Sequence, residues 1–155
     1  MDTSSLLIGL GVTQLFVIPI YLYTRNKKKK ENMALEQFVA TGLKYGIEIT
    51  ELDSWQNSII GIDSLKKKIL FLRTVNDYED ETLVDLNQVK KCELIKVERN
   101  LEDGNSTVAR INLVFHLGNN KPDYSLEFYN SENTMMIVSE LQMAEKWCNI
   151  AIELI

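Results

Sequence analysis

Few residues in this chain are of a type that could do chemistry, and the first are one histidine and one acidic cluster. His116 is the only histidine, and no serine or cysteine is paired with it by a known catalytic motif. We interpret it as a surface or sheet-packed imidazole. The carboxylates of Asp77, Glu79, Asp80 and Glu81 could in principle bind calcium. Their spacing lacks the D-x-[DN]-x-[DN]-G pattern and its distal glutamate, so a solvated loop is the better interpretation.

The other signatures of enzymes and metal sites are missing from the sequence. Cys92 and Cys148 lie far apart, with no cysteine or histidine at metal-ligand spacing, so neither a disulfide framework nor a zinc site is indicated. There is no glycine-rich phosphate loop, no G-x-S-x-G and no H-E-x-x-H. We therefore predict a non-enzymatic protein without catalytic residues, metal or cofactor. An enzyme whose site is assembled from scattered residues is the lowest-ranked alternative.

Two lysine runs are the candidate binding residues. Lys66, Lys67 and Lys68 form one run, which could bind a carboxylate or phosphate. The alternative is a hairpin turn before an apolar strand, where lysines protect the strand from edge pairing. The second run, Lys27 to Lys30, follows an uncharged segment in "YLYTRNKKKK". It could bind anionic lipid, at about 1 kcal/mol per charge, but we interpret it as a membrane-surface and topology signal.

The uncharged segment before these lysines predicts a transmembrane anchor over residues 1–30. Residues 6–23 are mostly apolar, and about 20 apolar residues in a helix span a bilayer. A cleaved signal peptide would begin with basic residues and end at small ones, whereas this chain begins "MDTSS" and continues into "YLYT". Basic residues favour the cytoplasmic side. We expect a single-pass protein of the inner (plasma) membrane, with its N-terminus outside and its C-terminal domain in the cytoplasm.

The net charge of residues 31–155 argues against nucleic acid as a partner. Residues 25–30 carry five of the 17 lysines and arginines, and Asp2 is the only acidic residue before them. Residues 31–155 therefore hold 12 basic against 21 acidic residues, a formal charge of −9. Nucleic-acid affinity comes largely from neutralising phosphates, so we predict no nucleic-acid partner.

The pattern of apolar residues predicts the elements behind the anchor. Residues 31–46 have helical spacing and read as a juxtamembrane helix or linker. From residue 47 short strands separated by turn residues follow, at the spacing of an antiparallel sandwich or barrel. The chain ends in an amphipathic helix within residues 134–155, either part of the core or a docking surface. The expected strands are residues 46–52, 58–63, 66–74, 82–86, 89–99, 109–117 and 124–130.

About seven strands and one closing helix are the order of the pleckstrin-homology (PH) fold. The stretches "IIGIDSLKKKILFLR", "TLVDLNQVKKCELIKVE" and "YSLEFYNSENTMMIVSELQMAEKWCNIAIELI" resemble the paired strands, last strand and closing helix of bacterial PH-like domains, with Trp147 as a core tryptophan. The resemblance covers residues 46–155 approximately. It implies an α+β fold and a binding module, for phosphoinositide headgroups in some members and for peptides or proteins in others.

These observations together predict a membrane-anchored, non-enzymatic module with a PH-like cytoplasmic domain at residues 47–155. Its expected role is to recruit or scaffold a protein partner at the cytoplasmic face of the membrane. The alternative is a lipid- or headgroup-sensing protein. Against that alternative, lipid-binding PH domains concentrate lysine and arginine between their first two strands, and the corresponding segment "DSWQNS" contains neither.

Overall fold

The computed structural model describes residues 28–75, 78–100, 104–118, 121–133 and 139–155. The chain divides into two compact units, Met1–Thr41 and Gly42–Ile155. In the first unit the described residues are helical, and this helix extends to residue 44. No helix in the described ranges is long and apolar enough to cross a membrane. Of the anchor predicted for residues 1–30, residues 1–27 lie outside those ranges, and these include its apolar segment and Lys27.

Gly46 ends the helix at residue 44. Its φ of +68° is in the left-handed region that favours glycine. The amide of Ile47 donates to the carbonyl of Gly42, and the amide of Gly46 donates to that of Leu43, each at 3.0 Å. These two bonds form a Schellman motif, which satisfies carbonyls that the end of a helix leaves without partners.

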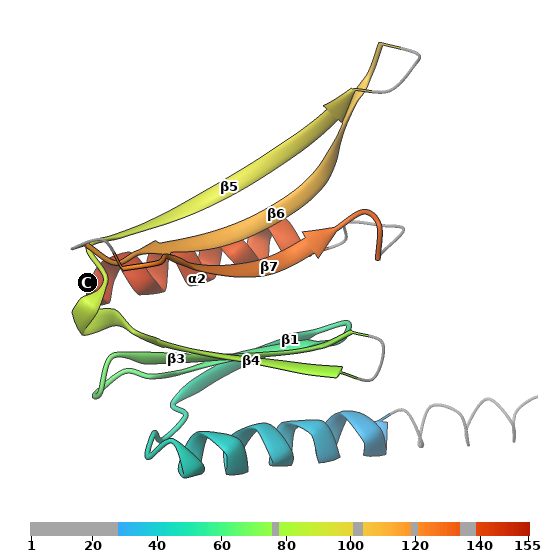
Figure 1. Ribbon diagram of the computed structural model, residues 1–155. Coiled ribbons are helices and arrows are strands. Elements are labelled where there is room, and N and C mark those ends of the chain that lie inside the picture. The colour runs from blue at the N-terminus through green and yellow to red at the C-terminus, as the bar shows by residue number, and fades with distance from the viewer. Residues whose placement is uncertain (1–27, 76–77, 101–103, 119–120, 134–138) are drawn as a thin grey trace, which may run out of the picture. The chain divides into compact units, whose positions relative to one another are not determined.

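The first four strands form one antiparallel sheet in the order β1-β2-β3-β4 (Figure 1). The strand β2 is buried along its whole length. Such burial is typical of a central strand that is covered on both faces, and it agrees with the apolar run in the sequence of β2. Hairpins join each strand to the next, which places sequential strands side by side. The bounds are β1 Glu51–Trp55, β2 Ser58–Asp63, β3 Lys68–Val75 and β4 Tyr78–Asp85.

The structure corrects the sequence prediction at both ends of this sheet. We expected a strand at residues 46–52, but the helix cap at Gly46 delays β1 until Glu51. We expected an acidic loop at residues 77–81, but residues from Tyr78 onward form β4, with Asp80 opposite Arg73. An edge strand tolerates charged residues because one of its sides and much of its surface face water.

The remaining three strands form a second antiparallel sheet in the order β5-β6-β7. A short 3-10 helix, η1, connects the two sheets after β4. The sequence "ARINLVFHL" alternates apolar and polar residues and predicts a strand with one face exposed to water. The structure confirms this, since Ile111, Leu113 and Phe115 are fully buried and Arg110 is exposed. In "YSLEFYN" the sequence predicts Tyr124, Leu126 and Phe128 inward. Leu126 and Phe128 are buried, but Tyr124 is the first residue of β7 and is 38% exposed. The bounds are η1 Leu86–Gln88, β5 Lys91–Asn100, β6 Ser106–His116 and β7 Tyr124–Asn130.

The C-terminal helix α2, Glu140–Leu154, lies along the second sheet and contacts β5, β6 and β7 (Figure 1). Its buried face includes Ala144, Trp147, Cys148 and Ala151, all part of the hydrophobic core. The helix is therefore a core element. The sequence also offers Asn133, or Ser131 just before it, as a cap for this helix. That prediction is wrong, because Ser139 precedes the first turn.

Trp147 connects α2 to the first sheet. Its side chain is completely buried, and its indole Nε1 donates to Oδ2 of Asp53 at 2.9 Å. Lys146 donates to the same oxygen at 2.6 Å and forms an ion pair with Glu51 at 2.8 Å. A buried indole N–H needs a partner, since leaving it without one costs free energy. Asp53 thus accepts the hydrogen bond from Nε1, the only polar atom in the Trp147 side chain.

We predict that Asp53→Ala lowers the free energy of unfolding by about 1–3 kcal/mol, because the indole N–H of Trp147 loses its acceptor. The matched control is Glu51→Ala, which removes only an exposed ion pair with Lys146 and should cost less than about 1 kcal/mol. Urea denaturation followed by tryptophan fluorescence measures both, since Trp55 and Trp147 are the two tryptophans and both are buried. Equal losses would show that the indole bond contributes nothing of its own.

Candidate functional site

A pocket of about 330 Å³ lies at the ends of β1, β3 and β7. It brings together three segments that are far apart in sequence: the β1–β2 turn, the end of β3 and the turn that follows β7. Seven of its ten lining residues are polar, which distinguishes it from the mostly apolar pockets typical of small-molecule sites. The lining residues are Trp55, Gln56, Asn57, Ser58, Arg73, Thr74, Val75, Phe128, Glu132 and Asn133.

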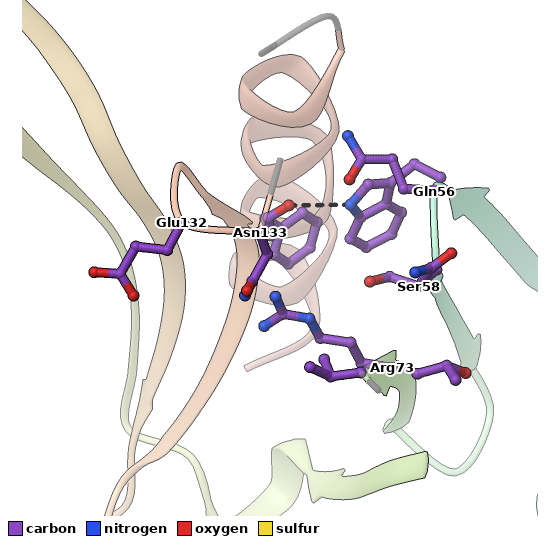
Figure 2. A pocket seen from close by; sticks show the side chains of 10 residues that line it. Gln56, Ser58, Arg73, Glu132 and Asn133 are labelled. Atoms are coloured by element: carbon purple, nitrogen blue, oxygen red, sulfur yellow. Dashed lines mark hydrogen bonds between the residues drawn. The ribbon is translucent and has the colours of Figure 1, made fainter. Parts of the chain in front are cut away.

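The apolar wall of the pocket is a stack of aromatic rings. The rings of Trp55 and Phe128 are stacked with centroids 4.6 Å apart, and Phe71 lies about 6 Å from each of them. The indole Nε1 of Trp55 also donates to the carbonyl oxygen of Phe128 at 3.1 Å (Figure 2). Stacking and hydrogen bonding together hold the ends of β1 and β7 in place, so this wall is rigid.

Arg73 is the one cation that lines the pocket. Its Nη1 donates to Oε1 of Glu127, whose other oxygen accepts from Asn130 Nδ2 at 3.1 Å and lies 3.6 Å from Arg110 Nε. Two arginines thus share one carboxylate. Among the residues that the structure describes, Glu127 is the hydrogen-bond and ion-pair partner of the Arg73 guanidinium. The remaining N–H donors of Arg73 are therefore available to a ligand.

Amide side chains form the rim of the pocket. Gln56 and Asn57 make the β1–β2 turn, and Nε2 of Gln56 donates to the buried carboxylate of Glu140 at the start of α2. Figure 2 shows Asn133 and Arg73 pointing toward one another from opposite sides of the pocket, whereas Glu132 points away. The arrangement offers several N–H donors beside one apolar wall.

This donor set suits a ligand that presents oxygen acceptors. A guanidinium binds planar carboxylate or carbonyl oxygens well, and amides and hydroxyls add hydrogen bonds of either direction. Sequence reasoning missed the pocket, because its residues have ordinary types and no fixed spacing. The turn at Gln56 and Asn57 lies in the segment that we noted only for its lack of basic residues.

The structure places the predicted binding lysines elsewhere, around the β2–β3 turn. Lys66 donates through Nζ to the carbonyl of Gly46 and through its backbone amide to Asp63, at 2.9 Å for the latter. Lys67 has a φ of +54° within the turn, and Lys68 opens β3 opposite Asp63 and Asp85. The hairpin interpretation is confirmed, but protection of an edge is the wrong reason, since β3 is a central strand.

Carboxylates offset the charge of this lysine run. Two backbone amides, that of Glu48 first and that of Lys66 second, lower the pKa of Asp63 and keep it ionised. Burial alone would raise the pKa of Asp85, but hydrogen bonds from Asn87 and then from Gln88 lower it, and the charge of Lys68 adds the smallest contribution. The run is therefore a weaker anion site than its composition indicated. Lys28, Lys29 and Lys30 are exposed on the helix at residues 28–44.

The structure also shows the surroundings of His116 and of the acidic cluster. Nδ1 of His116 lies 2.7 Å from Oδ2 of Asp123, and its Nε2 lies 3.1 Å from Oε2 of Glu93. Both ring nitrogens are thus occupied by carboxylates. In β4, Glu79 and Glu81 lie on one face of the strand and Asp80 lies on the other, so the three carboxylates do not gather on one face. Asp77 lies outside the described residues.

Cys92 and Cys148 are both free and buried in the core. They meet where β5 contacts α2, although 55 residues of the chain separate them. Burial, and then the neighbouring Cys148, raises the pKa of the Cys92 thiol. A thiol that stays protonated is a poor nucleophile and a poor metal ligand, so this pair is part of the packing.

We predict that Asp123→Asn lowers the pKa of His116, because hydrogen bonds to Asp123 first and Glu93 second raise that pKa above its ordinary value. The wild-type pair contributes stability fully below about pH 6.5. That contribution is lost as the pH rises through the higher folded-state pKa. Since His116 is the only histidine, one NMR imidazole signal reports the titration. Glu93→Gln is the control and should give the smaller decrease; an unchanged pKa in Asp123→Asn would contradict the assignment.

Comparison with known proteins does not identify this chain: no family model, no curated protein and no solved structure matches it. The resemblance to PH domains therefore stays a prediction from the sequence. The described part of residues 42–155 has two antiparallel sheets, of four and three strands, and a C-terminal helix.

Proposed function

We propose that the chain is a membrane-anchored, non-enzymatic PH-like module that recruits a protein partner to the cytoplasmic face of the membrane. The observation that carries the proposal is the polar pocket beside Arg73, which presents unused N–H donors next to a fixed aromatic wall. A binding module needs such a preorganised surface, because groups already held in place lose less conformational entropy on binding.

The character of the pocket favours a protein ligand over a small molecule. Small-molecule pockets enclose most of their ligand within apolar walls. Here the residues are mainly polar and come from turns at the ends of the strands. A side-chain carboxylate or an exposed backbone carbonyl of a partner could reach Arg73 while the rest of the partner lies across the turns. The rim amides of Asn57 and Asn133 would bind neighbouring polar groups.

The charge of the chain fits the same role. Residues 31–155 carry a formal charge of −9, and a net charge of that size speeds association with a partner of basic overall surface. The anchor predicted at residues 1–30 would hold the domain at the membrane without any lipid affinity of its own. The surroundings of Lys66 and Lys68, which include Asp63 and Asp85, do not favour the headgroup-sensing alternative.

We predict that Arg73→Gln reduces capture of the partner by about tenfold or more. A hydrogen bond to a charged group is worth about 1.5–3 kcal/mol, and each 1.4 kcal/mol is a factor of about ten in affinity. The measurement is photocrosslinking in native membranes from a photoreactive residue at Asn57, with yields compared between full-length variants. Glu127 keeps Asn130 and Arg110 as partners in this variant, so the fold is preserved.

Arg110→Gln is the matched control, because Arg110 contacts the same Glu127 but does not line the pocket. It should leave the crosslinking yield unchanged. A second comparison separates recruitment from lipid sensing: the chain without residues 1–30 is mixed with anionic vesicles. Strong, salt-sensitive vesicle binding by that shortened chain, or equal yields from the two arginine variants, would contradict the proposal.

A further inference from the structure

We propose that β5 is a homodimer interface, at which the β5 strands of two copies of this chain pair antiparallel into one continuous sheet. The inference does not depend on the pocket or its ligand. In the order β5-β6-β7, β5 pairs with β6 on one side only, and the described residues supply no strand on its other side. Figure 1 shows β5 as the outer margin of this sheet.

The second half of β5 is open along its length. Residues 95–100 are all exposed, and they include two β-branched apolar side chains, Ile95 and Val97, that are 39% and 47% exposed. A long edge strand with unpaired backbone groups and exposed apolar residues is a template for another strand. Edge strands are usually shortened or interrupted by a bulge or proline. Here the bulge opposite Val97 and Glu98 lies on β6, and β5 itself runs for ten residues.

The charges on β5 identify the partner strand as a second β5. In a twofold antiparallel pair centred on Val97, Lys96 of each copy lies opposite Glu98 of the other. Such opposite charges stabilise directly facing cross-strand pairs. Centring the pair on Lys96 would oppose two lysines, and centring it on Glu98 would oppose two glutamates. Of these three registers, the charge sequence therefore favours the one centred on Val97.

The same register brings the exposed apolar residues together. Successive side chains of a strand alternate between faces, so Ile95 and Val97 share one face and Lys96 and Glu98 share the other. Around the axis, Val97 faces Val97 of the second copy, and Ile95 of each copy lies diagonal to it. On the opposite face Lys96, which already forms an ion pair with Glu98 of its own chain at 2.8 Å, gains a second carboxylate.

Disulfide crosslinking of the full-length chain in native membranes tests the register. Residues directly opposite in antiparallel strands have Cα atoms about 4.5–5.5 Å apart, which a disulfide spans. Val97→Cys should therefore crosslink two copies under mild oxidation. Ile95→Cys is the matched control on the same face: the two Ile95 positions are offset by four residues, roughly 13 Å along the strand. Equal crosslinking of both variants, or none from Val97→Cys, would overturn the proposal.

Charge reversal then separates contacts between copies from those within one chain. In a Val97→Cys background, Lys96→Glu alone or Glu98→Lys alone opposes like charges and should reduce crosslinking by about tenfold or more. Coexpression of the two single variants pairs each with its complement and should restore the crosslink as a mixed dimer. The ion pair within each chain stays broken in that mixture. Restoration therefore supports pairing between copies, whereas failure to restore, or undiminished single variants, would overturn it.

Discussion

The rest of the structure depends on the burial of Trp147 between the two sheets. An antiparallel pair of sheets that is open at one side exposes its core, and an amphipathic helix must cover that opening. α2 does so with Ala144, Trp147, Cys148 and Ala151 against the second sheet. The indole then reaches Asp53 in β1 of the first sheet. This hydrogen bond and the contacts of Lys146 with Asp53 and Glu51 join α2 to β1. Burial of the ring supplies about 1.5–3 kcal/mol of hydrophobic stabilisation.

Much of this fold follows from local patterns in the sequence. The alternation along β6 predicted a strand with one wet face, and the four-and-three spacing near the C-terminus predicted α2. The sequence prediction is wrong where pairing with a neighbouring strand outweighs the intrinsic preferences of the residues. Glu79 to Glu81 have low intrinsic preference for strands, yet the hairpin from β3 supplies their backbone partners, which only the neighbouring strand could reveal. Tyr124 continued an apolar alternation, but the core ends before the start of β7.

The candidate site was less predictable than the fold, and the reason is geometric. Its donors come from the β1–β2 turn, the end of β3 and the turn after β7, and no motif fixes the sequence distance between such segments. Composition pointed instead to Lys66–Lys68, because a run of like charges is visible in one dimension. The carboxylates that face these lysines, Asp63 and Asp85, are apparent only once β2, β3 and β4 are paired. A charge run therefore indicates where basic side chains lie, not how much of their charge is unopposed.

The proposed recruitment would not require a tight pocket. A single guanidinium and a few amides give modest affinity, since each hydrogen bond replaces one to water and contributes about 0.5–1.5 kcal/mol net, or about 1.5–3 kcal/mol where one group is charged. The proposed anchor would confine the domain to the membrane surface, and pairing of β5 strands would give two pockets in one assembly. A partner that engages both would bind the second intramolecularly, at an effective concentration set by the spacing of the sites. Edge pairing and the pocket can then act together although they lie on different elements, because the dimer raises avidity without changing any contact to Arg73.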